Sequence, residues 1–99
     1  MGAGYVGILS VELHFPEAGS LKGKRKHVSS AKAQLQNRFG ASVSEVDHHE
    51  QWQRCELAMA CAAREVGALH HLLDDAERWL YAQDWVVARV ERRIVSLND

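Results

Sequence analysis

The spacing of apolar residues along this 99-residue chain switches several times between two residues and about 3.6 residues. This change between strand and helix periodicity is the sequence feature that most restricts the possible folds. Alternation predicts strands over residues 5–15, 41–48, 54–62 and 85–95. Helical spacing predicts helices over residues 21–39 and 65–83. The order β-α-β-β-α-β predicts an α+β ferredoxin-like sandwich, with a four-stranded antiparallel sheet and both helices on one face.

Local signals support these boundaries. Ser20 is a suitable N-cap for the first helix, and Gly40 is a suitable C-terminal stop. In the second strand, Val43 and Val46 are out of phase, which a bulge or an edge position would explain. The first four residues are expected to be disordered or to have been added for expression.

Length and composition indicate a single domain over residues 1–99, since the chain is 46% hydrophobic and too short for two domains. Segments without charged or strongly polar residues, such as 57–63, are well below the roughly 20 apolar residues of a membrane span. Cys55 and Cys61 are too few for a disulfide scaffold and read as reduced thiols. We therefore expect a cytoplasmic protein with no membrane partner, and for so small a domain a homodimer.

Charge is strongly segregated although the net charge is only −1. Residues 20–39 carry six bases and no acid, whereas residues 44–84 carry nine acids and three bases. The bases at the start of the first helix lie where backbone N–H groups already favour an anion. They predict a phosphate or RNA contact through Lys22, Lys24, Arg25, Lys26 and Arg38; the alternative is a solvated helix face.

The sheet face without helices is the second candidate site. In the predicted register it carries Ile8, Ser10, Glu12, His14, Glu56, Ala58, Ala60, Trp85, Val87, Arg89 and Glu91. It lacks the aromatic pair with which a sheet stacks RNA bases, so sheet-face RNA binding is disfavoured. The candidates there for acid/base chemistry or for binding a small molecule are Glu12, His14, His48, Glu56 and Arg89. The alternative is a set of cross-strand ion pairs that stabilises a dimer.

Residues 45–54 form a polar connection between two strands. Asp47, His48, His49 and Glu50 offer metal-ligand atoms, but adjacent histidines on a strand point to opposite faces, and we predict neither a metal nor a cofactor. Trp52 must either pack back on the hairpin or face a partner. The predicted partner contacts are Asp47, Trp52 and Arg54. No nucleophile elbow, Walker loop, dinucleotide fingerprint or zinc-protease helix occurs.

Several motifs resemble the YlxP-like family of small bacterial proteins of unknown function, over residues 5–62. The matching segments are His14-Phe15-Pro16-Glu17, Ser20-Leu21-Lys22, Lys24-Arg25, Asn37-Arg38-Phe39, Glu45-Val46-Asp47-His48 and Trp52-Gln53-Arg54-Cys55-Glu56-Leu57. The resemblance implies a ferredoxin-like fold and, because such genes lie among translation genes, a cytoplasmic role near RNA or the ribosome. Gly23 and His49 depart from the family pattern and leave room for a specialised paralogue.

Three hypotheses follow from the sequence. The leading one is a binding or assembly factor whose basic helix contacts RNA or a ribosomal partner. The second is an enzyme or a small-molecule binder that uses the open sheet face. The third is a structural dimerisation module without a ligand.

Overall fold

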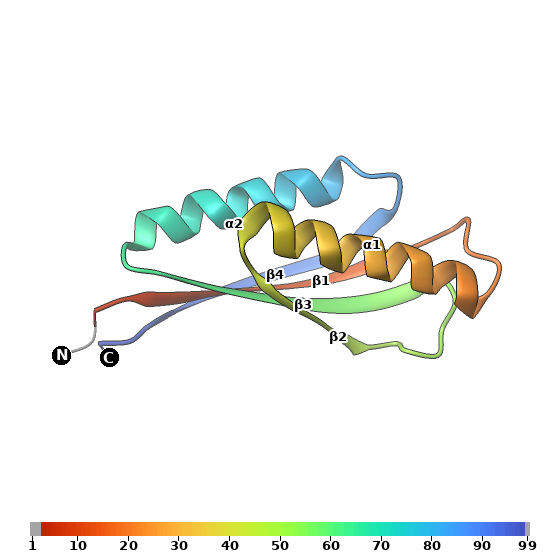
Figure 1. Ribbon diagram of the computed structural model, residues 1–99, viewed down its shortest axis with the longest axis horizontal. Coiled ribbons are helices and arrows are strands. Elements are labelled where there is room, and N and C mark those ends of the chain that lie inside the picture. The colour runs from red at the N-terminus through yellow and green to blue at the C-terminus, as the bar shows by residue number, and fades with distance from the viewer. Residues whose placement is uncertain (1–2, 99) are drawn as a thin grey trace.

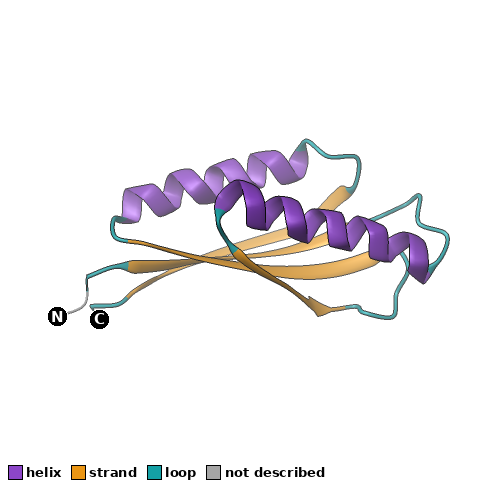
Figure 2. Ribbon diagram, in the orientation of Figure 1, coloured by secondary structure: helices purple, strands orange, loops and turns teal. Residues whose placement is uncertain are grey.

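The computed structural model describes residues 3–98 and confirms the predicted order of elements. The elements are β1 (Tyr5–His14), α1 (Leu21–Phe39), β2 (Ser42–Asp47), β3 (Arg54–Ala63), α2 (Val66–Tyr81) and β4 (Val86–Ser96). The antiparallel sheet has the order β2-β3-β1-β4, and both helices cover one face, as Figures 1 and 2 show. The fold is therefore ferredoxin-like, with one sheet face left open.

The core lies between the sheet and the two helices. Leu9 and Leu13 of β1 are fully buried, as are Leu35 of α1 and Leu73 of α2. Gly7 on β1 permits close approach of α2, because a Cβ there would lie 3.2 Å from Leu73 Cδ1. The alternating small and large residues of β1 thus set the distance between the sheet and α2.

The ends of α1 follow the sequence signals. Ser20 is the N-cap, and its Oγ accepts a 3.0 Å hydrogen bond from the Gly23 amide. Gly40 ends the helix in the left-handed conformation, with φ of 61°. Both predicted boundaries are confirmed because each depends on one residue and its immediate neighbours.

The two edge strands contain irregularities. β2 is an edge strand with a register shift between Glu45 and Asp47, which confirms the expected bulge. A second shift, opposite Glu12 and Leu13, places Val87 of β4 across from Leu13. The prediction that Trp85 and Val87 lie on the open face was therefore wrong, since the bulge turns both toward the core.

The start of β1 and the end of β4 lie together at one end of an elongated molecule, whose extents are 50, 23 and 21 Å (Figure 1). The disorder expected over residues 1–4 falls partly outside the described residues, which begin at Ala3. At Gly4, the carbonyl accepts a 2.9 Å hydrogen bond from the Leu97 amide. Neither helix within residues 3–98 is long and apolar enough to cross a bilayer.

Candidate functional site

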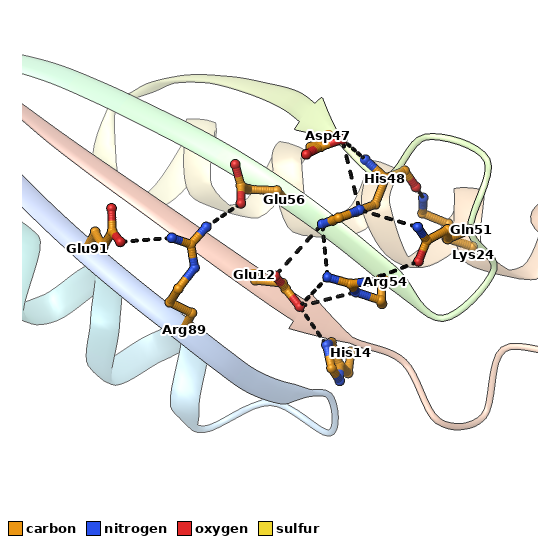
Figure 3. A network of polar contacts seen from close by, with 10 residues as sticks. All are labelled: Glu12, His14, Lys24, Asp47, His48, Gln51, Arg54, Glu56, Arg89 and Glu91. Carbon is orange, nitrogen blue, oxygen red and sulfur yellow. Dashed lines mark hydrogen bonds and ion pairs between the residues drawn. The ribbon is translucent and has the colours of Figure 1, made fainter.

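Six charged or imidazole side chains gather at one end of the open face, and we call them the open-face cluster (Figure 3). Its members are Glu12, His14, His48, Arg54, Glu56 and Arg89. The pairing of β1 with β3 sets Glu12 opposite Glu56 and His14 opposite Arg54, and the pairing with β4 sets Glu12 opposite Arg89. The structure thus brings together all five residues that the sequence offered for acid/base or ligand chemistry.

Glu12 is the centre of the cluster. Its Oε2 lies 2.7 Å from His14 Nε2 and accepts a 3.2 Å hydrogen bond from Arg54 Nε. The hydrogen bond with His14, together with the positive charge and hydrogen bond of Arg54, lowers the pKa of Glu12 below its ordinary value of 4.5, although desolvation opposes the shift. Glu12 is therefore a carboxylate at neutral pH.

His48 has an unusual backbone conformation, with a φ of 64°. Among residues 3–98 it is the only non-glycine residue with a positive φ. Its amide donates to Asp47 Oδ1 at 2.7 Å, and its carbonyl accepts from Lys24 Nζ. These two contacts fix the left-handed turn and direct the imidazole back over the sheet. His48 Nε2 then lies 3.8 Å from Glu12 Oε1.

The imidazole of His48 contacts Arg54 through its Nε2 atom. Arg54 Nη2 lies 3.1 Å from His48 Nε2, and a guanidinium can only donate. His48 Nε2 therefore accepts from Arg54, and His48 Nδ1 has Gln51 Nε2 at 3.5 Å and Asp47 Oδ1 at 3.9 Å as its neighbours.

Glu56, Arg89 and Glu91 form the outer part of this surface. Arg89 donates to Glu56 Oε1 and to Glu91 Oε1, the second at 2.8 Å. The negative charge of Glu91 and then that of Glu56 raise the pKa of Arg89 above its ordinary value. One oxygen of Glu56 is thus occupied by a fixed cation.

Lys24 is completely buried, which excludes it from the predicted phosphate contacts. Its Nζ lies 3.1 Å from Glu45 Oε2, and the Glu45 side chain is itself almost entirely buried. Arg25 Nη1 donates to the other oxygen, Glu45 Oε1, at 3.1 Å. The prediction for Lys24 was wrong, because this ammonium joins α1 to β2 and to the His48 carbonyl and does not face solvent.

The remaining bases of α1 divide into two groups. Lys22, Arg25 and Lys26 are exposed near the start of the helix. Arg38 lies about 18 Å farther along from Lys26, at 1.5 Å per residue. Its guanidinium sits 5.7 Å from the centre of the Trp79 ring of α2. The five predicted phosphate contacts therefore do not form one patch.

The loop between β2 and β3 packs against the start of α1. Arg25 Nη2 donates to the His49 carbonyl at 3.4 Å, and Gln53 Nε2 donates to the carbonyls of Pro16 and Ala18. Trp52 projects from this anchored loop with 53% of its surface exposed. This exposure favours contact with a partner over packing back on the hairpin, the alternative weighed from the sequence.

The other two predicted partner contacts have internal roles. Asp47 accepts the His48 amide, although its side chain stays exposed. Arg54 points into the open-face cluster and also lines a shallow hollow of about 370 Å³ formed by residues 50–54. Among these three residues, Asp47 and Trp52 have exposed side chains, whereas Arg54 is held within the open-face cluster.

Sequence reasoning missed the pair of Lys24 and Glu45. A signal was present, because Lys24 precedes Val28, Ala31 and Leu35 at the spacing of the buried face of α1. Glu45 follows Val43 by two residues and so shares its inward direction. A base and an acid on facing buried positions predict an internal ion pair.

Comparison with known proteins places this fold and these motifs in a family. Residues 6–93 match the family described as "Protein of unknown function (DUF503)". The chain belongs to this family. The uncharacterized protein YlxP of Bacillus subtilis (strain 168) is 33% identical over 58 residues, which cover 59% of this chain and 63% of that protein. The alignment thus spans less than two thirds of the DUF503 relative.

One solved structure supports the fold of this DUF503 member, and its low sequence identity carries no information on activity. The de novo designed protein Foldit4 superposes with a TM-score of 0.56 and 10% identity, covering 93% of this chain and 96% of the design. A Bacillus cereus crystal structure described as an antibiotic biosynthesis monooxygenase has a TM-score of 0.45 and 9% identity, covering 99% and 96% of the two chains.

Proposed function

We propose that this chain is a non-enzymatic RNA-binding factor of the bacterial cytoplasm, associated with the ribosome or its maturation. The observation that carries the proposal is the position of Trp52, an exposed aromatic ring on a loop fastened to the basic start of α1. Base stacking on an aromatic ring together with phosphate contacts from nearby bases is how proteins hold single-stranded RNA.

The exposed bases follow one side of α1. At 100° per residue, Lys22, Arg25 and Lys26 fall within about one third of the helix circumference, and the partly exposed Lys32 lies about two turns beyond Arg25 on the same side. We call these four residues the basic stripe. Residues 20–39 contain no acid, and among residues 3–98 the ion pair formed by the stripe is that of Arg25 with Glu45. Lys22 and Lys26 keep their full charge toward a polyanion.

Charge reversal at the start of α1 tests the proposal. The double variant Lys22→Glu/Lys26→Glu is expected to weaken binding of a single-stranded RNA oligomer at low salt by about 100-fold or more, because charge-assisted phosphate contacts are worth roughly 1.5–3 kcal/mol each. Trp52→Ala is expected to cost a further factor of about ten. Fluorescence anisotropy measures both effects, and neither site contributes to the core.

A matched control is Arg64→Glu/Arg93→Glu, which changes the net charge equally at exposed positions outside the basic stripe. Equal loss of affinity in both double variants, or no RNA binding by the wild type at low salt, would contradict the proposal. Light scattering on the same samples tests the homodimer expected from the sequence, for which the uncovered sheet face is the support. A mass of twice 11.1 kDa supports the dimer, and 11.1 kDa at every concentration contradicts it.

A further inference from the structure

We propose that Glu12, His48 and Glu56 bind one divalent transition-metal ion of the Zn²⁺ type on the open face of the sheet. One ligand atom from each residue lies within 4.8 Å of the other two. The three residues come from β1, the β2–β3 loop and β3, so the fold and not a local motif creates the set. This site is separate from the basic stripe and does not depend on RNA binding.

Glu12 and His48 each direct a donor atom toward the other residue of the set. Glu12 Oε2 is held by His14 and Arg54, whereas Glu12 Oε1 has His48 Nε2 as its close neighbour at 3.8 Å. His48 Nε2 carries a lone pair, as its contact with Arg54 requires. For Glu56, Arg89 occupies Oε1 and leaves the carboxylate its second oxygen.

Neighbouring side chains contact the three proposed ligands and hold them in place, as residues around a metal site do for its ligands. Asp47 Oδ1 accepts a 2.7 Å hydrogen bond from the His48 amide, and Gln51 Nε2 lies 3.5 Å from His48 Nδ1, so both residues help to position the imidazole. Arg54 and Arg89 fix the carboxylates. The side chains of Glu12, His48 and Glu56 are 13%, 17% and 19% exposed, so they are shielded from bulk water but open to an ion.

The left-handed turn at His48 gives the set its rigidity. A buried lysine on the carbonyl and a carboxylate on the amide hold this backbone conformation, which is costly for most residues other than glycine. The imidazole is thereby aimed across Glu12 rather than outward beside His49. This resolves the objection that adjacent histidines on a strand point to opposite faces, because His48 lies after the strand has ended.

The donor set indicates the class of ion. Two carboxylates and one imidazole supply oxygen and nitrogen atoms and a formal charge of −2, which suits Zn²⁺ or a similar borderline ion better than Ca²⁺ or a thiolate-seeking metal. Ligand atoms around tetrahedral Zn²⁺ are ~3.3 Å apart, so the side chains must close by about 1.5 Å. Three protein ligands leave a position for water or a substrate, as in catalytic zinc sites.

Arg54 provides the most specific consequence of this geometry. Its guanidinium now satisfies the His48 lone pair that the ion would take, so binding must move Arg54 off His48 while its contacts to Glu12 and Gln51 can remain. Removing this cation therefore removes a competitor. Arg54→Gln is expected to bind Zn²⁺ about tenfold more tightly than the wild type, the opposite of what loss of a ligand would do.

Zn²⁺ titration of the full chain by calorimetry, with Co²⁺ as a spectroscopic probe, tests the proposal. One ion per chain is expected, with visible Co²⁺ bands that indicate nitrogen and oxygen ligands. His48→Asn, which tolerates the left-handed backbone, is expected to weaken Zn²⁺ binding at least tenfold and to abolish the bands. Glu56→Gln is expected to weaken it similarly, and thermal melts confirm that both variants fold.

His49→Ala is the matched control, since its exposed imidazole lies outside the set and its loss is expected to leave affinity unchanged. The proposal is overturned if the wild type shows no saturable Zn²⁺ binding up to about 1 mM. It is also overturned if His48→Asn binds as the wild type does, which would place the ion elsewhere, for example at His70 and His71. Lys22→Glu/Lys26→Glu is expected to keep the metal site, so the two proposals can fail separately.

Discussion

The buried charge of Lys24 stabilises two parts of the structure, the packing of α1 on β2 and the turn at His48. Its ammonium joins Glu45 of β2 and the His48 carbonyl, so it supports both the attachment of α1 and the turn that aims the imidazole. Lys24→Met removes the positive partner while Glu45 stays buried with only Arg25 beside it. We expect this variant to lose about 3 kcal/mol of unfolding free energy, measured by urea denaturation.

The double variant Lys24→Met/Glu45→Met distinguishes an ion pair from simple packing. Because both charges are then absent, at least half of the lost stability is expected to return. If Lys24→Met alone changes the unfolding free energy by less than about 1 kcal/mol, the buried pair does not carry the role assigned to it.

Glu12 gives the open-face cluster a dependence on pH. Its pKa is lower in the folded chain than its ordinary value of 4.5, so the ionised form is favoured by folding. The stabilisation is therefore complete above pH 4.5 and is lost as the pH falls through the folded pKa. In Glu12→Gln, unfolding free energy is expected to fall less steeply than in the wild type between about pH 5 and pH 3.

Glu17→Gln serves as the control for this acid titration, since Glu17 is an exposed carboxyl outside the open-face cluster. It is expected to leave the slope of stability against pH nearly as in the wild type. An equal slope for wild type and Glu12→Gln would show that the cluster does not favour the ionised form of Glu12.

The two helices differ in how their N-termini are satisfied. α1 has a capping hydrogen bond from Gly23 to Ser20, whereas Glu65 at the start of α2 makes no such bond, although its φ of −114° and ψ of 135° suit a cap. Glu65→Asp keeps the negative charge and supplies a shorter side chain that reaches the backbone. Stability is expected to rise by about 0.5–1 kcal/mol, seen as a higher Tm.

Glu65→Gln separates the cap from the charge, because it removes the charge without improving the cap. It is expected to be neutral or slightly destabilising. A Tm for Glu65→Asp no higher than that of the wild type would mean that the first turn of α2 is satisfied in another way.

At the level of elements, the features predicted correctly from the sequence are those that depend on residues close together in the chain. The limits of α1 follow from Ser20 and Gly40, and the type and order of all six elements follow from periodicity. The inward turn of Trp85 and Val87 could not be predicted, because the bulge in β4 depends on its pairing with β1. Before such pairing is known, a single alternation over 85–95 is the simplest interpretation.

The candidate site was predictable in part for the same reason. Strand alternation alone puts Glu12, Glu56 and Arg89 on one face. The left-handed turn that adds His48 is not encoded by alternation, since it depends on Lys24 from a helix 24 residues away in sequence. The metal-ligand set that the structure assembles therefore differs from the consecutive residues 47–50 considered from the sequence.

Across the whole molecule, a net charge of −1 conceals a basic α1 beside an acidic α2. Asp74 and Glu77 of α2 pair with Arg92 of β4, so part of the acidic charge is used internally, whereas Lys22 and Lys26 form none of the ion pairs seen among residues 3–98. Affinity for a polyanion should therefore depend on the basic stripe rather than on net charge.

The salt dependence of RNA binding measures how many bases of the stripe take part. If Lys22, Arg25, Lys26 and Lys32 each neutralise one phosphate of a single strand, log K against log salt concentration is expected to have a slope of about −3. Losing two contacts in Lys22→Glu/Lys26→Glu should reduce the slope to about −1.5, whereas Arg64→Glu/Arg93→Glu should leave it unchanged. A wild-type slope near zero would mean that RNA, if bound, is held without phosphate contacts, and α1 would then not be the binding surface.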